Sequence, residues 1–107
     1  MTFIKLGSVR TFPGVKPTKE QALKVLEEAS ETVEAFKKWL LADGFQKCNA
    51  EEFPADWADE ELNGLMDEIA DTIQACCNLA AALGVTDLTP YLARCEERNR
   101  RRGRYDE

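Results

Sequence analysis

Two acidic motifs with the same spacing stand 40 residues apart in this chain. The segment VLEEASET holds Glu28 and Glu31, and the segment LMDEIADT holds Glu68 and Asp71. Apolar and threonine positions match between the two segments at the same offset. Carboxylates one helical turn apart hold divalent cations or transfer protons, so the pattern indicates one of these two chemistries.

Helical geometry gives the two motifs equivalent positions. At roughly 100° per residue, each motif puts its two acids at about −100° and −160° from one apolar residue, Ala29 in the first and Ile69 in the second. We expect two antiparallel helices, packed through their apolar stripes, to bring the four carboxylates to one point. The same register pairs Thr32 with Thr72. The alternative is that the acids only solvate two helix surfaces, as EExxE patterns commonly do.

Four converging carboxylates need a neutralising partner. Each pair of like charges costs on the order of 1–4 kcal/mol, depending on the local dielectric. The chain contains no histidine, which excludes Cys/His zinc sites and Glu-x-x-His di-iron sites. Ligation by oxygen alone suits Mg²⁺, with Mn²⁺ as the alternative. The predicted metal ligands are Glu28, Glu31, Glu68 and Asp71.

A carboxylate-bound Mg²⁺ usually shares its coordination with substrate phosphates, which indicates phosphoryl or nucleotidyl chemistry. Such a reaction needs a proton acceptor for the attacking water. The candidates are Glu27 and whichever of Glu28 and Glu31 is not fully committed to the metal.

The motifs EEASE and EIAD together resemble the EExxE…ExxD signature of the MazG-like, all-α nucleoside triphosphate pyrophosphohydrolases. The resemblance covers roughly residues 18–105. It implies a hydrolase that cleaves an NTP or dNTP between the α and β phosphates, giving a nucleoside monophosphate and pyrophosphate, with Mg²⁺ on the four acids. Asn78 resembles the family's asparagine that contacts the nucleotide.

The chain departs from this family in one interval. The 36 residues between Glu31 and Glu68 are more than usual, so residues 44–58 are interpreted as an insertion near the pocket. A relative specific for a pyrimidine deoxynucleotide or a phosphoribosyl-linked nucleotide is therefore an alternative. A competing class is a non-catalytic helical interaction module whose acidic flanks meet a basic partner.

The charge of the chain is unevenly distributed. Residues 94–104 hold six Arg and two Glu, a charge of +4, which leaves −10 in the rest of a chain with net charge −6. An acidic body argues against nucleic-acid binding, where a broad basic face dominates affinity. Arg98 and Arg104 are predicted to clamp substrate phosphates, since Arg forks bind phosphate oxygens. The alternative is a solvated basic helix end, favoured by the helix dipole.

The elements that must position these residues are predicted to be helices. Residues 1–17 read as an irregular arm in which TFIKL is a possible short strand. Thr18 is a predicted N-cap for a helix that ends near Gly44. Residues 44–58 read as a loop, which can carry one short helical turn. The apolar stripe of the first helix is Ala22, Val25, Leu26, Ala29, Val33, Phe36 and Leu40.

The second predicted helix begins at Asp59 and ends at Gly84. A third begins at Asp87 or Thr89, with Pro90 in its first turn, and runs to about Arg101. The apolar stripe of the second helix is Leu62, Leu65, Ile69, Ile73, Cys76, Ala80 and Leu83.

The whole chain is therefore predicted to be one all-α domain, residues 1–107, folded as an antiparallel bundle of three to four helices. Its length suits a single domain, and it lacks an apolar run of about 18 residues and a signal peptide. We expect a cytoplasmic protein with no membrane partner. Three helices of this size seldom cover one another fully, so assembly as a dimer or tetramer is expected.

Overall fold

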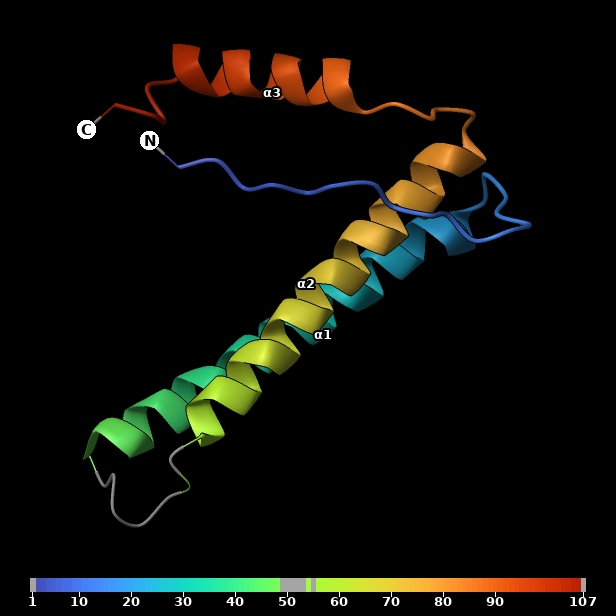
Figure 1. The fold of residues 1–107 in the computed structure, drawn as a ribbon. Helices are drawn as coiled ribbons and strands as arrows, with labels where there is room; N and C mark the ends of the chain where they lie inside the picture. The colour runs from blue at the N-terminus through green and yellow to red at the C-terminus, as the bar shows by residue number, and fades with distance from the viewer. Residues whose placement is uncertain (1, 49–53, 55, 107) are drawn as a thin grey trace.

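The chain folds into three helices, which a computed structural model describes over residues 2–48, 54 and 56–106. They are α1 (Lys19–Cys48), α2 (Trp57–Ala82) and α3 (Thr89–Arg101) (Figure 1). The described residues contain no strand. The all-α prediction is confirmed with three helices. The strand prediction for TFIKL is wrong, because this extended segment has no neighbouring strand with which to pair.

Helices α1 and α2 pack against each other as an antiparallel hairpin. Their less exposed residues recur at alternating spacings of three and four, which is the pattern of a coiled-coil seam. Small side chains dominate the middle of this seam and let the two backbones approach closely. The seam residues are Val25, Glu28, Thr32, Ala35, Trp39 and Ala42 on α1 and Leu65, Glu68, Thr72, Ala75 and Leu79 on α2.

Only one edge of each predicted apolar stripe packs between α1 and α2, so the prediction that the helices pack through these stripes is wrong for most stripe residues. Val25 and Leu65 lie in the seam, whereas Leu26 is 66% exposed, Phe36 45% and Leu62 40%. The seam runs roughly 100° around each helix from the stripe, where alanine and threonine permit the close approach that Leu and Phe would block. The stripes instead form one continuous surface, here called the apolar face. It consists of Leu26, Val33, Phe36, Leu40, Leu62, Met66 and Ile69.

The ends of the hairpin helices depend on contacts between them. The Thr18 hydroxyl accepts a hydrogen bond from the Gln21 amide at 3.2 Å, which confirms the predicted N-cap. Helix α1 continues past its predicted end at Gly44, and α2 begins two residues before Asp59. The Gln46 side chain explains both differences, because it lies in the added turn of α1 and accepts a hydrogen bond from the Ala58 amide at 3.0 Å.

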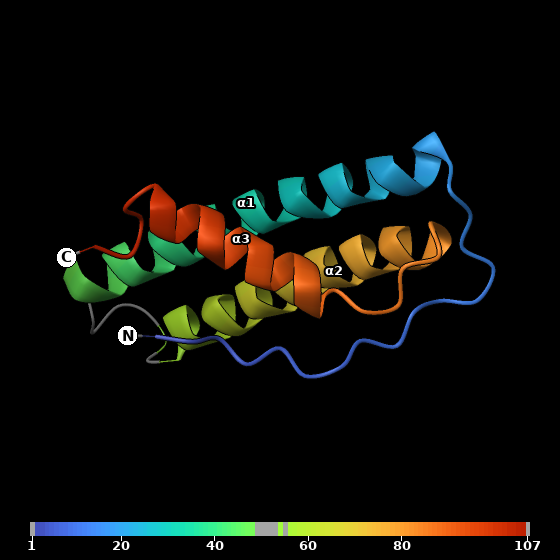
Figure 2. The ribbon, with the colours of Figure 1, turned by 90° about the horizontal axis from the view of Figure 1, so that it is seen from above.

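Two local hydrogen-bonded motifs shape the connection from α2 to α3. Gly84, with φ +81°, ends α2 in a Schellman motif in which the Val85 amide bonds to the Ala80 carbonyl at 2.9 Å. The Thr89 amide then donates to the Asp87 carboxylate at 2.9 Å, where α3 begins. Figures 1 and 2 show α3 running over the hairpin without lying on it. Within the described residues, α3 makes no helix-to-helix contact with α1 or α2.

The fold is less compact than that of a typical globular domain of the same length. Its radius of gyration is 17.6 Å, whereas a compact domain of this length has about 13 Å. No described helix combines the length and the apolar content needed to cross a bilayer. The predicted dimer or tetramer stays a prediction.

Candidate metal centre

A pair of threonines joins α1 to α2 at the centre of the seam. The hydroxyl oxygens of Thr32 and Thr72 lie 3.0 Å apart, which confirms their predicted pairing. The backbone carbonyl of Glu68 lies 3.1 Å from Thr32 Oγ1 and 3.0 Å from Thr72 Oγ1. This pair fixes the register of the two helices, so each acidic motif begins one turn before a threonine held in the seam.

Carboxylates from both helices converge beside this threonine pair. One oxygen each from Glu28, Glu68 and Asp71 lies within 4.8 Å of the others. Glu28 and Glu68 are half-buried in the seam, whereas Asp71 is exposed. The structure thus brings together three of the four predicted metal ligands.

Two oxygens of this cluster are buried with nothing to bind. Glu28 Oε2 and Glu68 Oε2 are inaccessible to solvent and accept no hydrogen bond from the described residues. A buried carboxylate oxygen normally has a partner, because burial without one costs free energy. A set of ligands made only of carboxylate oxygens, two of which lack a hydrogen-bond partner, fits a hard divalent cation such as Mg²⁺ or Mn²⁺.

The electrostatics of the cluster agree with this geometry. Burial raises the pKa of Glu28 most, and the charge of Glu31, a hydrogen bond with Glu31 and the charges of Asp71 and Glu68 raise it further. Burial likewise raises the pKa of Glu68 most, followed by the charges of Glu31 and Asp71 and a hydrogen bond with Glu31. Glu31, the fourth predicted ligand, is therefore close enough to act on both buried acids, and it is exposed. Four carboxylates repel one another here, as expected from the sequence.

The raised pKa values predict that protonation of Glu28 and Glu68 stabilises the metal-free protein. The folded state holds the protons of Glu28 and Glu68 more tightly than the unfolded state, in which each pKa is near its ordinary value of 4.5. This stabilisation is full below pH 4.5 and is lost as the pH rises through the raised folded values. Thermal unfolding in EDTA between pH 4.5 and 7 measures it.

The variant Glu68→Gln should flatten this pH dependence, because it removes one of the two shifted groups. The control Glu34→Gln, at an exposed acid paired with Lys37 at 3.1 Å, should keep the wild-type slope. Equal slopes in wild type and Glu68→Gln would contradict the assignment.

Glu27 lies on the surface next to the cluster. Its carboxylate pairs with the Lys24 ammonium at 3.0 Å, and both side chains are exposed. The pKa of Lys24 is raised first by its hydrogen bond to Glu27, and also by the charges of Glu28 and Glu31. The Lys24 ammonium therefore lies at the edge of the carboxylate cluster, and Glu27 is its ion-pair partner.

Asn78 is buried and holds the N-terminal arm on α2. It is 4% exposed, and its side-chain oxygen accepts hydrogen bonds from the Phe12 amide at 3.1 Å and from Gln74 Nε2 at 2.9 Å. Gln74 Nε2 also donates to the Arg10 carbonyl at 3.0 Å. Sequence reasoning missed Gln74, although its spacing of four from Asn78 on a helix was a usable signal. Nucleotide contact by Asn78 stays a prediction.

Replacing Asn78 by alanine should release the arm. The change removes the acceptor of the part-buried hydrogen bond from the Phe12 amide, and a typical intramolecular hydrogen bond contributes about 0.5–1.5 kcal/mol. Limited proteolysis should then cut residues 2–12 faster than in wild type, while circular dichroism still reports the helices. The control Asn63→Ala, at an exposed position of α2, should leave the cleavage rate unchanged. An arm as resistant in Asn78→Ala as in wild type would contradict this role.

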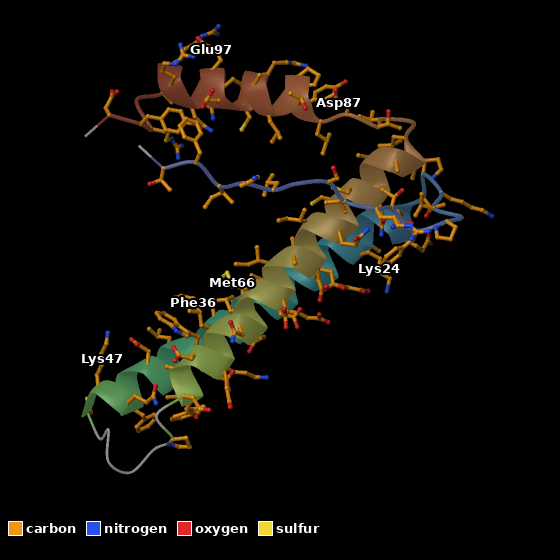
Figure 3. All side chains as sticks on the ribbon, viewed as in Figure 1. Lys24, Phe36, Lys47, Met66, Asp87 and Glu97 are labelled. Atoms are coloured by element: carbon orange, nitrogen blue, oxygen red, sulfur yellow. The ribbon has the colours of Figure 1, made fainter. Side chains whose placement is uncertain are left out.

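The structure does not bring Arg98 and Arg104 to the carboxylates of the same chain. Both belong to the α3 segment, which makes no helix contact with α1 or α2 among the described residues. Gly103, with φ +70°, ends α3 in a second Schellman motif, in which the Arg104 amide bonds to the Asn99 carbonyl at 3.0 Å. Figure 3 shows Glu97, in the same part of α3, far from Lys24, which marks the acidic side of the hairpin.

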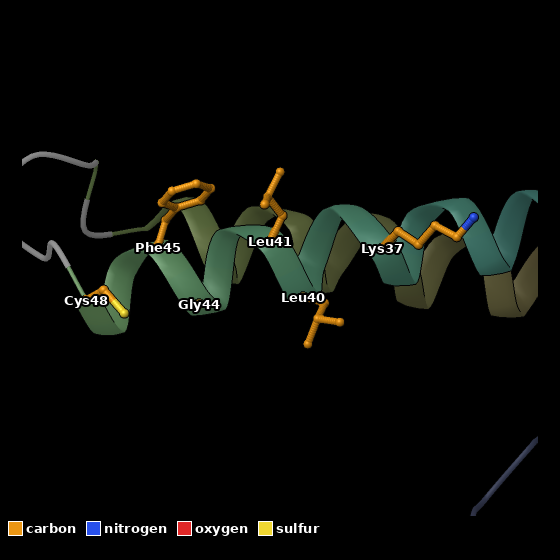
Figure 4. A pocket seen from close by; sticks show the side chains of 6 residues that line it. All are labelled: Lys37, Leu40, Leu41, Gly44, Phe45 and Cys48. Atoms are coloured by element: carbon orange, nitrogen blue, oxygen red, sulfur yellow. The ribbon is translucent and has the colours of Figure 1, made fainter.

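Two surface hollows lie elsewhere on the hairpin. One, of about 500 Å³, is lined near the end of α1 by apolar side chains and Lys37 (Figure 4). The other, of about 630 Å³, lies between α2, the arm and the start of α3. Neither is lined by a carboxylate of the cluster.

Comparison with protein-family models, with curated proteins and with solved structures finds no match to this chain.

Proposed function

We propose that this chain is a Mg²⁺-dependent nucleoside triphosphate pyrophosphohydrolase. One observation carries the proposal: two buried carboxylate oxygens from different helices have no hydrogen-bond partner and lie in a cluster with a third acid. The resemblance of EEASE and EIAD to the MazG-like signature supplies the reaction class.

The residues that would hold the metal are Glu28, Glu68 and Asp71, with Glu31 beside them. When bound, Mg²⁺ neutralises phosphate charge and lowers the pKa of a water ligand. The chain's own contribution is to fix carboxylates from α1 and α2 around one point through the Thr32–Thr72 pair.

Glu31 is the best placed proton acceptor. It is exposed and acts on the pKa of both buried acids, so it lies at the open side of the cluster. Glu27 is less suitable, because its carboxylate is already paired with Lys24. A carboxylate at this position accepts a proton from the attacking water, whose oxygen bonds to phosphorus as the bridge between the α and β phosphates breaks.

Lys24 is a candidate substrate contact. Its ammonium lies at the edge of the acidic cluster, where it can donate to a phosphate oxygen that approaches the metal. A point charge of this kind binds phosphate without selecting a base.

Product analysis tests the proposal. The protein is incubated with a panel of NTPs and dNTPs and Mg²⁺, and pyrophosphate and orthophosphate are measured separately. We expect pyrophosphate and a nucleoside monophosphate from at least one nucleotide, and none after EDTA treatment. A preference for pyrimidine deoxynucleotides would select the more specialised relative. If no nucleotide yields pyrophosphate, the enzyme assignment is wrong.

A second candidate is the non-catalytic interaction module. The observation that favours it is the exposed apolar face, since contiguous apolar surfaces of this kind mark interaction sites. Absence of pyrophosphate release together with stable binding of a basic partner to the acidic side of the hairpin would favour this candidate.

A further inference from the structure

The N-terminal arm is fixed to α2 next to the carboxylate cluster. Asp71, Gln74 and Asn78 recur at spacings of three and four, so they lie along one side of α2. Gln74 Nε2 donates to the Arg10 carbonyl at 3.0 Å. Two residues further along the arm, the Phe12 amide donates to Asn78 Oδ1 at 3.1 Å. The arm therefore meets α2 on the turn that follows Asp71, with Arg10 at the level of Gln74.

The Arg10 side chain is directed toward the acidic side of the hairpin. Successive side chains of an extended segment project to opposite sides, and the arm around Arg10 is extended (Figure 1). Its neighbours Val9 and Thr11 line the hollow of about 630 Å³, whereas Arg10 does not. Ala80 also lines this hollow and, nine residues after Asp71, lies about 180° around α2 from that acid. Away from the hollow is thus toward Asp71.

Arg10 is an exposed cation within reach of the cluster. Among the described residues its guanidinium forms no ion pair, and the residue is exposed. The rise along α2 from Asp71 to Gln74 is about 4.5 Å, which the long arginine side chain can span. Arg10 can therefore meet an anion that is bound beside Asp71.

The proposed metal centre needs a further cation to hold a triphosphate. Four carboxylates and one divalent cation leave two negative charges, which repel a polyanionic substrate. Lys24 supplies one positive charge on α1, but Glu27 pairs with it. Arg98 and Arg104 belong to the α3 segment, which makes no helix contact with the hairpin among the described residues. Arg10 is better placed than either of these to supply the missing charge.

We propose that Arg10 binds the terminal phosphate of the substrate and selects triphosphates over diphosphates. This inference rests on the proposed hydrolase function. Lys24 on α1 and Arg10 over α2 flank the cluster at one end of the hairpin, because the start of α1 lies beside the end of α2 (Figure 1). The β and γ phosphates, which leave together as pyrophosphate, extend toward this end. The arginine fork binds two oxygens of the γ phosphate at once, which a lysine ammonium does not.

Steady-state kinetics with the preferred nucleoside triphosphate and its diphosphate tests the proposal. Arg10→Ala should raise KM for the triphosphate about tenfold, as expected for a lost charge-assisted hydrogen bond. The value of kcat should change less than about twofold, because the terminal phosphate is bound equally before and during the reaction. KM for the diphosphate should stay within about twofold. Arg10→Lys should recover part of the loss, and the matched control Lys5→Ala, which removes a cation from the same arm, should keep both KM values.

The anchoring of the arm is tested by Gln74→Ala. The Arg10 carbonyl loses its donor in this variant, so the arm is held less firmly and KM for the triphosphate should rise. The double variant with Arg10→Ala should be no worse than Arg10→Ala alone, since both changes remove the same contact. Fully additive losses in the double variant would overturn the role of the arm in placing Arg10.

A binding measurement separates this inference from the proposed function. If wild type releases pyrophosphate and Arg10→Ala keeps the wild-type KM for the triphosphate, the inference is wrong and the proposed function stands. Calorimetry with inorganic tripolyphosphate and Mg²⁺ requires no turnover. Weaker binding by Arg10→Ala than by wild type and Lys5→Ala would support the contact even if no nucleotide is hydrolysed. Equal binding by all three proteins, or none by wild type, would overturn it.

Discussion

Replacing Glu68 by glutamine should abolish pyrophosphate release and leave the fold intact. Glu68 supplies one of the two buried oxygens without a partner and lies within the group of three carboxylates. Even the hydrogen-bond partners of metal ligands cost roughly 10- to 100-fold when mutated, so a direct ligand should cost about 100-fold or more in kcat/KM. Steady-state release of pyrophosphate at saturating Mg²⁺ measures the loss.

The same variant should unfold at an equal or higher temperature in EDTA near neutral pH. Burial first, and then repulsion from Glu31 and Asp71, raise the pKa of Glu68, so its charged form is unfavourable without a cation. Added Mg²⁺ should stabilise wild type more than Glu68→Gln, since only wild type keeps the full ligand set. These opposite effects on activity and stability separate a metal ligand from a structural acid.

Two further variants test the role assigned to Glu68. Asp71→Asn should behave like Glu68→Gln, because Asp71 is the third member of the group. Glu60→Gln changes an exposed acid in the first turn of the same helix and should keep wild-type kinetics. Full activity in both Glu68→Gln and Asp71→Asn would refute the candidate centre even if the chain proved to be a hydrolase.

Replacing Ala75 by leucine should force α1 and α2 apart. Ala75 is 6% exposed in the seam, on the turn that follows Thr72. Inserting larger side chains into a packed interior typically costs about 1–3 kcal/mol. Chemical unfolding measures this loss. Because the Thr32–Thr72 contact at 3.0 Å requires close helices, Mg²⁺ should also stabilise the variant less than it stabilises wild type.

Ala70→Leu is the matched control, since Ala70 is exposed on the same helix. It should change the free energy of unfolding by less than about 0.5 kcal/mol, as surface substitutions usually do. If Ala75→Leu kept both the stability and the Mg²⁺ response of wild type, the seam would not set the spacing of the carboxylates.

The convergence of the acids was predictable because it depends only on helical periodicity and a constant offset. Once Thr32 faces Thr72, the register of an antiparallel pair follows, and Glu28 and Glu68 come with it. The choice of packing surface was not predictable in this way. Periodicity shows that Leu26 and Ile69 lie on apolar stripes, but it does not say whether a stripe meets the neighbouring helix or another surface.

The remaining differences between the sequence-based predictions and the structure arise from contacts between residues far apart in the chain. Helix α1 passes Gly44 because Gln46 binds the Ala58 amide at the start of α2, which offsets the cost of glycine in a helix, about 1 kcal/mol. The irregular arm has no periodicity, so its attachment to Asn78 could not be read from its own residues. The sequence predicts a substrate contact for Asn78, whereas in the structure its side-chain oxygen accepts hydrogen bonds from the Phe12 amide of the arm and from Gln74.

The threonine pair at the centre of the seam has a further consequence for how the centre is assembled. Hydroxyl groups do not change charge over the pH range in which the neighbouring carboxylates gain or lose protons. The spacing between the two helices is thus set by neutral atoms, and protonation alters the charge of the cluster without altering its framework. Under the proposed function, binding of a cation would therefore require no refolding, unlike in a zinc finger that folds only around its metal. Exchange of such a cation would then be limited by its own dehydration, which is slow for Mg²⁺ among the common biological ions.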